Sequence, residues 1–439
     1  MSTYCYTPPF VTTSIPPLVM LLISKDHKMF FKAYDDVVSL TGNGIPNTTY
    51  TDTINYYGYF DPNKCYSYVT SPFTGFQPVS FASGTNLHYC SGQWSGNFLN
   101  WATMARIDIV RAVLYGGKRT IDQSGGTTVL SRTTLTQDAH SFVKIYTGSD
   151  IAQLTPSNGS ANQTAITICN TNDSNTGNEA NWSLMNFYWG NVANGPAEPT
   201  NPYNAGDSSS SVNKALQYYP YAAALDGGVQ CTKQYNTAAN TGPPLPSSSQ
   251  TAQGYGGSYY VNVQVCNPTV GLESNCLQYG TSSYKPTGLM QTLGLNPITN
   301  APRMYFALMT GSYNLNQSGG VMRSNFTNMT QEINTSDGTI NTTSSNIIKT
   351  LDMLQLINYD YVNKTWAPVS GGPGNCALAS TFTQPDCNNW GNPMGEMYYE
   401  ALRFFAGKSG PTSQFYSSTP DPTSVFNDVL YASSATSLP

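Results

Sequence analysis

The densest group of chemically reactive side chains follows a short apolar run near the start of this 439-residue chain. Residues 18–23 read LVMLLI, and residues 24–28, SKDHK, come directly after them. Open α/β folds bind ligands at the carboxyl ends of their central strands, so this position suits a binding or catalytic group. His27 could ligate a metal or transfer a proton there, although a single histidine is more often a surface residue. The pattern marks a candidate site without assigning its chemistry.

A second polar segment, residues 39–47, has the spacing of a calcium-binding loop. Oxygen-bearing side chains alternate around two glycines, at Ser39, Thr41, Asn43 and Asn47. Calcium takes oxygen ligands, and its affinity rises with the negative charge of the site. All four side chains are neutral, so the spacing favours a Gly/Asn turn over a strong calcium site.

Hydrolase chemistry is an alternative function that the three histidines His27, His88 and His140 keep open. Residues 138–141, DAHS, place an acid, a histidine and a serine together, but catalytic triads are assembled from distant segments. The chain also lacks a G-x-S-x-G nucleophile elbow. A hydrolase would need a cleft that brings one histidine against a serine or cysteine nucleophile.

The nine cysteines are spread singly, and no C-x-x-C pair suggests a zinc knuckle or a thioredoxin-like centre. Their spacing therefore favours disulfides that staple loops with little core of their own, while the connectivity stays open. The candidate local pairs are Cys65 with Cys90, Cys266 with Cys276, and Cys376 with Cys387. The odd count leaves one cysteine, with Cys5 as the candidate, free or paired outside the chain.

Low charge is the most informative feature of the composition. Only 10% of the residues are Asp, Glu, Lys or Arg, against about 25% in ordinary soluble proteins. Ser, Thr, Asn, Gly and 31 Tyr take their place, a profile typical of secreted or surface proteins. The net charge is −5 and no basic block is present, so nucleic acid is an unsuitable partner.

Membrane-spanning and leader segments are not recognisable in the sequence. The longest aliphatic run, residues 19–23, is far shorter than the ~18 residues that a transmembrane helix needs. No basic region followed by an apolar stretch precedes it, as a signal peptide would require. We expect a mature or truncated form of an exported chain.

The strongest helical pattern lies at residues 91–117, where apolar residues recur at three- and four-residue spacing. The pattern predicts one long buried helix that begins after Ser95 as N-cap and ends at Gly116. Asp108 and Arg111 are three residues apart, and we expect them to pair on the solvent side of that helix.

The other helices and strands are predicted from the periodicity of apolar residues and from the turn-forming residues that bound each segment. Continuous or alternating apolar runs predict strands, with residues 18–23 as a central strand buried on both faces, whereas longer periodic runs predict helices. The further predicted strands are 127–135, 259–265 and 303–310, and the further predicted helices are 29–38, 346–356 and 392–407. Residues 149–257 are rich in turn formers and predict a long surface insertion.

The last predicted helix has Asn392 as N-cap, a proline at the first position and Gly407 at its end. Its predicted core face comprises Met394, Met397, Tyr398, Ala401, Leu402 and Phe405. Glu396 and Glu400 share the other face and could bind a metal together. No histidine accompanies them, so a solvated face is the favoured interpretation.

Several segments resemble the amino-terminal region of the PilY family, type IV pilus assembly factors and tip adhesins of Gram-negative bacteria. They occur in the family's order and span residues 5 to about 411. They are PPLVMLLISKDHKMFFKAYDD, YYGYFDPNKCY, SGQWSGNFLNWATMARIDIVRAVLYGG, VQVCNP, RMYFALMTGSY, SGGVMRSN and WGNPMGEMYYEALRFFAGK. The polar insertion between them matches poorly.

The resemblance implies an α/β fold, a von Willebrand factor A-like doubly wound sheet with long loop-rich insertions. Residues 1–148 and 258–411 would form its two parts, and residues 149–257 would be the polar insertion. Residues 412–439 would be a tail that leads to a carboxyl-terminal domain outside this chain, a calcium-binding β-propeller in the family.

The resemblance also implies metal sites, which this sequence alters. The family's Asp-x-Ser-x-Ser adhesion motif is matched by Ser24, Asp26 and Lys28, and a lysine ammonium there would replace the cation, so we expect weak Mg²⁺ binding. The Asp-rich loop of the family is matched in this chain by neutral residues that include Asn43 and Asn47. No cofactor is certain, and Ca²⁺ binding is expected to be weakened.

The function implied is non-enzymatic: pilus biogenesis and adhesion at the pilus tip or the cell surface of a Gram-negative bacterium. The expected partners are pilins or minor pilins and a host or abiotic surface, contacted through the Tyr-rich loops and the polar insertion. Two alternatives remain, a structural minor component of a surface filament and, less favoured, a secreted hydrolase.

Overall fold

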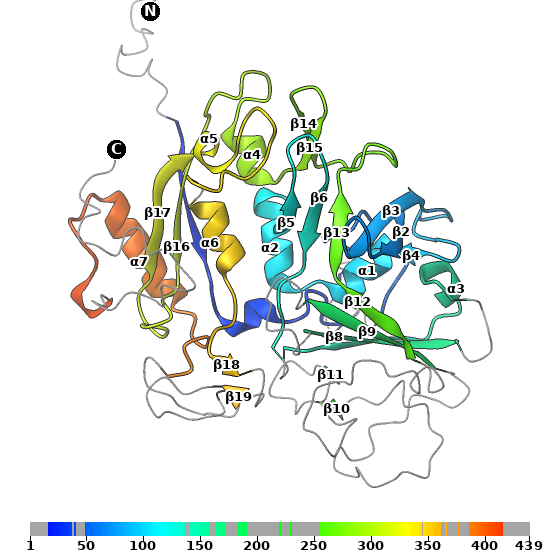
Figure 1. Ribbon diagram of the computed structural model, residues 1–439. Helices are drawn as coiled ribbons and strands as arrows, with labels where there is room; N and C mark the ends of the chain where they lie inside the picture. Colours follow the sequence, from blue (N-terminus) through cyan, green and yellow to red (C-terminus); the bar gives the residue numbers. More distant parts are fainter. Residues whose placement is uncertain are drawn as a thin grey trace, which may run out of the picture.

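The computed structural model has a mixed α/β architecture with several sheets (Figure 1). It describes residues 16–36, 39–40, 49–136, 138, 140–157, 163–172, 183–190, 219–220, 229–230, 255–344, 346–360, 365–366, 376 and 386–415. The expected α/β class is confirmed. A doubly wound sheet of von Willebrand A type stays a prediction.

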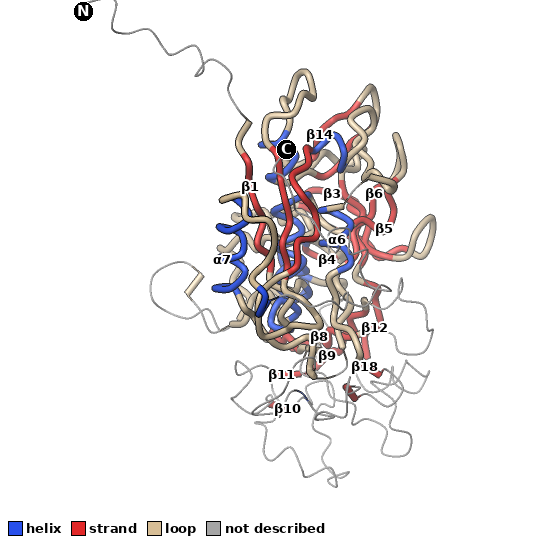
Figure 2. The backbone as a smooth tube through the Cα atoms, turned by 90° about the vertical axis from the view of Figure 1, so that its left-hand side faces the viewer, coloured by secondary structure: helices blue, strands red, loops and turns tan. Residues whose placement is uncertain are grey.

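A three-stranded sheet carries the strand that leads into the candidate site. Strand β1 (Leu18–Ile23) pairs in parallel with β16 (Tyr305–Thr310), which pairs in antiparallel with β17 (Val321–Asn328). Helices α7 (Met394–Phe405) and α6 (Ile347–Met353) lie on opposite sides of this sheet (Figure 1, Figure 2). Residues 18–23 and 303–310 therefore form strands, as predicted.

The predicted central position of β1 is wrong. Within the described ranges, β1 is an edge strand whose only strand partner is β16. Its side chains are half-buried, and Leu18 is exposed. A continuous apolar run indicates burial on both faces, but it does not reveal how many strands lie beyond it, because that depends on distant segments.

Two further sheets form the other half of the molecule. In the six-stranded sheet, ordered β4-β2-β3-β13-β6-β5, all pairs are antiparallel except β3 with β13. Its strands are β2 (Lys64–Val69), β3 (Gly75–Phe81), β4 (Trp94–Ser95), β5 (Arg119–Asp122), β6 (Thr128–Ser131) and β13 (Asn262–Val265). The four-stranded antiparallel sheet, ordered β12-β9-β8-β7, comprises β7 (Val143–Tyr146), β8 (Ala165–Thr171), β9 (Leu184–Gly190) and β12 (Tyr255–Tyr260).

Two hydrophobic clusters correspond to these halves. One gathers side chains of the three-stranded sheet and of the helices beside it, such as Leu308, Met329 and Leu351. The other is rich in aromatic residues from the two larger sheets, among them Trp94 and Phe187, whose ring centroids are 4.9 Å apart. Most tyrosines of residues 54–68 are buried in the second cluster, so they act chiefly as core.

The predicted long helix at residues 91–117 is two helices, α1 (Gly96–Thr103) and α2 (Arg106–Tyr115). Met104 and Ala105 between them are extended and bond to residues 31–33, so the backbone groups that a continuous helix would use are taken by a distant segment. The predicted ends are confirmed. The Ser95 side chain caps α1, and Gly116 ends α2 in the left-handed region with a φ of 91°.

The predicted solvent-side pair of Asp108 and Arg111 is buried instead. The two charges are 3.7 Å apart with side chains 0% and 1% exposed. The Asp108 carboxylate accepts from the Ala105 amide, which starts α2, and Arg111 donates to the Leu351 and Leu354 carbonyls at the end of α6. The pair therefore joins two helices. From the sequence, an exposed position was favoured for both side chains, because charged residues are seldom fully buried.

The remaining helix and strand predictions have mixed outcomes. Residues 127–135 contain β6, and 346–356 contain α6, as predicted. Residues 29–38 are not an α-helix within the described part, because only the 3₁₀ turn η2 (His27–Phe30) forms. Residues 259–265 divide at Val261 between β12 and β13 of different sheets.

Short elements complete the described part of the chain. They are α3 (Ile151–Leu154), α4 (Leu289–Gly294), α5 (Met329–Glu332), η9 (Ser413–Phe415), the hairpin of β14 (Cys276–Tyr279) and β15 (Ser283–Pro286), and the pairs β10 (Tyr219–Pro220) with β11 (Val229–Gln230) and β18 (Tyr359–Asp360) with β19 (Thr365–Trp366).

The predicted insertion, residues 149–257, contributes regular structure at both of its ends. Strands β8 and β9 lie within it and bury Ile166, Met185 and Phe187 in the aromatic cluster. Its borders are therefore part of a packed sheet rather than a surface loop. Most of residues 191–254 lie outside the described ranges, and the domain boundaries stay predictions.

Helix α7 forms in the predicted segment, but its N-cap is Pro393 and not Asn392, and it presents a different face to the core. Met397 and Ala401 are buried as expected, together with Glu400 and Phe404. Tyr398, Tyr399, Leu402 and Phe405, three of them assigned to the core from the sequence, are exposed. Glu400 is not on a solvated face, because its carboxylate accepts from the Thr412 amide at 3.0 Å and turns that side of the helix inward.

Among the described residues, no helix has both the length and the apolar character that crossing a membrane requires.

Candidate functional site at the end of strand β1

The polar segment after β1 is buried. Lys25, Asp26 and His27 are 1%, 7% and 5% exposed, and His27 opens the 3₁₀ turn η2. The segment packs against residues 386–391, since the Lys25 ammonium donates to the Asn388 carbonyl and the His27 amide to the Asn389 carbonyl at 2.9 Å. The surface position expected for a single histidine is therefore wrong for His27.

The predicted metal ligands of this segment already hold hydrogen bonds within the chain. The two carboxylate oxygens of Asp26 accept from the Lys28 amide at 3.0 Å and the Gly391 amide at 2.9 Å. The Ser24 hydroxyl accepts from the Asp26 amide at 3.1 Å. These hydrogen bonds use part of the acceptor capacity that a cation would need. Lys28 is exposed, and Asn43 and Asn47 lie outside the described residues, so the metal assignment stays a prediction.

A histidine pair is the chemically distinctive part of this site. The His27 Nδ1 and His140 Nε2 atoms are 3.2 Å apart, although 113 residues separate them in sequence. The other nitrogen of His140, Nδ1, lies 2.7 Å from a carboxylate oxygen of Asp138, and His140 is 1% exposed. Thr136 donates to the same carboxylate oxygen at 2.7 Å. The result is a buried chain of groups from Asp138 through His140 to His27.

The hydrogen-bond partners assign the tautomers of this chain. An ionised carboxylate only accepts, so His140 donates from Nδ1 to Asp138 and its Nε2 accepts from His27 Nδ1. Burial and the neighbouring His140 lower the pKa of His27 to about 4, which keeps that imidazole neutral at pH 7. Burial would raise the pKa of Asp138, but His140 and the Thr136 hydroxyl outweigh it and lower that pKa below its ordinary range.

Aromatic rings enclose the pair. His27 stacks on Trp390 with ring centroids 4.7 Å apart, and the Trp366 indole donates to Asp138 at 2.8 Å. The Cys376–Cys387 disulfide anchors the turn that carries Trp390. The sequence marked His27 and residues 138–141 as reactive but gave no signal that they meet, because their contact depends on the tertiary fold.

The geometry that a hydrolase requires is not found in the described part of the chain. The rings of His27 and His140 bond to each other and to Asp138 and Thr136, not to a serine or cysteine side chain. His88 is a separate buried group whose ring nitrogens contact the Asp52 carbonyl at 2.6 Å and the Asn55 amide oxygen at 2.8 Å.

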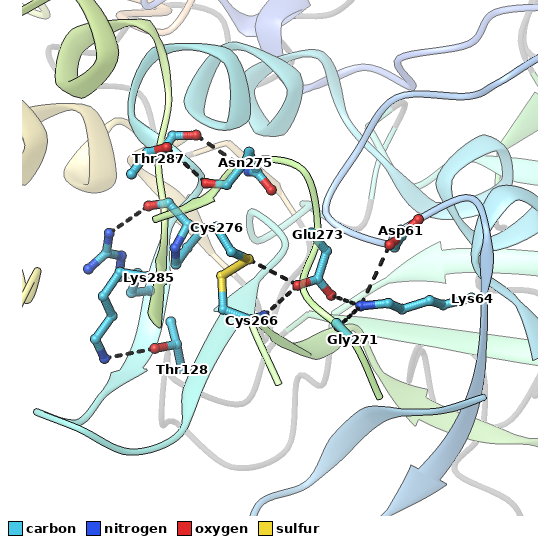
Figure 3. Close-up of a disulfide and its surroundings, with 12 residues drawn as sticks. Asp61, Lys64, Thr128, Cys266, Gly271, Glu273, Asn275, Cys276, Lys285 and Thr287 are labelled. Atoms are coloured by element: carbon cyan, nitrogen blue, oxygen red, sulfur yellow. Dashed lines mark hydrogen bonds and ion pairs between the residues drawn. A yellow bond between two sulfur atoms is a disulfide. The ribbon is translucent and has the colours of Figure 1, made fainter. Parts of the chain in front are cut away.

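A second cluster of potential metal ligands, Cys266, Glu273 and Cys276, lies beside the β14–β15 hairpin (Figure 3). The two cysteines form a disulfide, so neither sulfur carries a thiol that could ligate a metal in this state. The Glu273 carboxylate accepts from the Cys266 amide at 2.7 Å and from the buried Lys64 ammonium at 2.8 Å. This arrangement fixes the loop to strand β2.

All three disulfides expected from spacing are present. Cys65 pairs with Cys90, Cys266 with Cys276 and Cys376 with Cys387, with Cα–Cα distances of 5.7, 5.6 and 5.4 Å. Cys169 is disulfide-bonded as well. Cys5 lies outside the described residues.

Comparison with known proteins supports a PilY1-like family. A family profile described as PilY1 homolog, small alpha/beta domain, matches residues 47–186, and one described as PilY1 homolog, second domain, matches residues 306–434. The chain is 31% identical over 90% of its length to a Xylella fastidiosa (strain Temecula1) protein named type IV pilus biogenesis factor PilY1 homolog. A second protein of that strain with the same name is 30% identical over 55% of the chain.

The relatives are much longer than the matched region. The chain covers 25% of the first and 16% of the second. No solved structure matches this chain. The similarity agrees with the resemblance in the sequence segments.

Proposed function

We propose that the chain acts in type IV pilus biogenesis and adhesion at the cell surface or pilus tip, by binding pilins or minor pilins and an external surface rather than by catalysis. The observation that carries this proposal is the 31% identity over 90% of the chain to a protein named as a pilus biogenesis factor. The disulfides and buried ion pairs add a rigid scaffold of the kind on which binding surfaces are commonly placed.

The fold proposal is a von Willebrand A-like arrangement around β1, β16 and β17. Its support is the parallel pairing of β1 with β16 and the helices on both sides of that sheet, features shared with open α/β folds generally. We propose that Mg²⁺ and Ca²⁺ bind weakly at Ser24 and Asp26, because the Asp26 carboxylate already serves two backbone amides.

A deletion strain of the organism that encodes the chain tests the function. We expect fewer surface pili, and lower adhesion per remaining pilus, with both restored by the wild-type gene. Unchanged adhesion per pilus would favour the structural filament component instead. Normal pilus number and normal adhesion would reject the proposal.

A surface variant tests the binding part separately. Tyr398 and Leu402 on α7 are 59% and 51% exposed and are the apolar side chains that we expect to meet a pilus subunit. Tyr398→Ser with Leu402→Ser should reduce pilus binding in a pull-down while the chain stays folded. Ile298→Ser, at an 89% exposed site elsewhere, is the matched control and should bind like wild type.

A further inference from the structure

The facing ring nitrogens of His27 and His140 have the separation of two ligands on one metal ion. Tetrahedral zinc takes histidine nitrogens at about 2.0–2.1 Å, which places two such nitrogens about 3.3 Å apart. The observed distance between His27 Nδ1 and His140 Nε2 is 3.2 Å. A metal could therefore replace the proton between the rings with small ring movements.

The surroundings of His140 match those of a metal-bound histidine. A ligating histidine usually donates its other ring N–H to a carboxylate or carbonyl, which fixes the tautomer and raises the basicity of the ligating nitrogen. Asp138 takes this role at 2.7 Å from Nδ1, and is itself held by Thr136 and by the Trp366 indole. His140 Nε2 is thus presented as an electron-pair donor.

Histidine ligates a metal as the neutral imidazole. When the metal binds, the proton on His27 Nδ1 passes to Nε2, so both imidazoles stay neutral and no net proton is released. Imidazole suits Zn²⁺, Co²⁺, Ni²⁺ and Cu²⁺, whereas Ca²⁺ and Mg²⁺ prefer oxygen.

We propose that His27 Nδ1 and His140 Nε2 form a two-imidazole site for a divalent transition-metal ion of the Zn²⁺ class, with Asp138 as the group that orients His140. The site differs from the oxygen-ligand sites expected from the sequence, and it stands independently of the proposed pilus function.

Zinc titration of the oxidised chain tests the site. Free thiols are first alkylated, so that cysteine cannot bind the metal, and ZnCl₂ is then titrated by calorimetry in an acetate-free, phosphate-free buffer at pH 7. Wild type should bind one equivalent, and His27→Gln and His140→Gln should each weaken binding at least tenfold. His88→Gln is the matched control, because His88 is a buried histidine outside the pair, and it should bind like wild type.

Two further measurements keep the proposal falsifiable if a histidine variant fails to fold. Zinc K-edge X-ray absorption of the loaded wild type should show scattering from two imidazole rings and no sulfur ligand. Asp138→Asn should keep the stoichiometry and weaken affinity by about 10–100-fold. Absence of stoichiometric zinc binding to wild type, sulfur ligation, or equal binding by folded His27→Gln and His140→Gln would overturn the site, whatever the outcome of the pilus experiments.

Discussion

At the scale of single residues, several of the few charges of this chain lie inside it. In the part of the chain that the structure describes, seven basic residues are buried. They are Lys25, Lys64, Arg111, Arg132, Lys144, Lys285 and Arg323. Burial of an ion is costly unless its hydrogen bonds are satisfied, so each of these side chains constrains the segments around it. A chain of low charge content thus still places charged side chains in its interior.

Arg132 shows how strongly one such group is used. Its guanidinium donates to the Thr171 and Leu184 carbonyls at 3.0 and 2.9 Å and to the Ser183 hydroxyl at 2.9 Å, and thereby joins β6 to β8 and β9. Arg132→Met removes these hydrogen bonds from buried acceptors. We expect the free energy of unfolding to fall by about 3–5 kcal/mol in urea denaturation.

Arg303 is the matched control for that substitution. Its side chain is exposed, so Arg303→Met should change the free energy of unfolding by less than about 0.5 kcal/mol. Similar losses for both variants would show that the cost comes from the methionine and not from the Arg132 hydrogen bonds.

The pH dependence of stability should contain a contribution from His27. Its pKa is lowered to about 4 in the folded state by burial and His140, against an ordinary value of 6.5. Above pH 6.5 the ring is neutral in both states, whereas between pH 6.5 and 4 the unfolded state alone takes up a proton. The free energy of unfolding should therefore fall by up to about 3 kcal/mol as the pH drops through this window.

His27→Gln should flatten that decline. The measurement is urea denaturation from pH 7.5 to 4 with a chelator present, so that no metal competes for the rings. The groups that act on His27, namely His140, Asp26, Asp138 and Lys28, are retained in the variant. Parallel curves for variant and wild type would contradict the assignment.

At the scale of elements, the sequence predicts where a helix begins and ends better than whether it is continuous between those points. Ser95 and Gly116 act as predicted because caps depend on local backbone chemistry. The break at Met104 and Ala105 was not predictable, because the partners of those two residues come from residues 31–33. The exposed face of α7 was predicted wrongly for a related reason. The Glu400 carboxylate bonds to Thr412, and helical periodicity gives no information about such a partner.

Gly116 should tolerate substitution poorly. Its φ is 91°, and a Cβ there would lie 2.6 Å from the carbonyl carbon and oxygen of Pro286 in β15, where only backbone could yield. We expect Gly116→Ala to lower the free energy of unfolding by about 2–4 kcal/mol in urea denaturation. Gly125→Ala is the control: it shares a positive φ, but its Cβ would meet only the Ser282 hydroxyl at 3.7 Å, so about 1 kcal/mol is expected. Equal losses would mean that backbone conformation alone decides the cost.

At the scale of the whole molecule, helix α2 is shared by the two hydrophobic clusters. Ile107 and Tyr115 belong to one cluster and Ala112 to the other, and Arg111 binds the end of α6 from the same helix. The α/β class and several disulfide pairs were predictable, because period and spacing are local. The register of Leu18 with Tyr305, like the meeting of His27 and His140, was not, because it depends on which distant surfaces pack together.

The Asp108–Arg111 pair should show energetic coupling across this shared helix. Arg111→Met leaves the buried Asp108 charge without its partner, and we expect a loss of about 3–5 kcal/mol in the free energy of unfolding. The double variant Asp108→Asn with Arg111→Met should cost less than the sum of the single losses by about 0.5–3 kcal/mol. Additive losses in urea denaturation would show that the two charges do not interact.

The Cys65–Cys90 disulfide has a mechanical consequence for a chain under tension. Its two ends are 25 residues apart in sequence but 5.7 Å apart between Cα atoms. If the fold were pulled open along the backbone, this loop would stay closed, and about 80 Å of contour length would be withheld from the extended chain. The pulling force would pass through the disulfide from Cys65 in strand β2 to Cys90, which precedes helix α1. The covalent cross-link therefore sets how far this part of the molecule can lengthen.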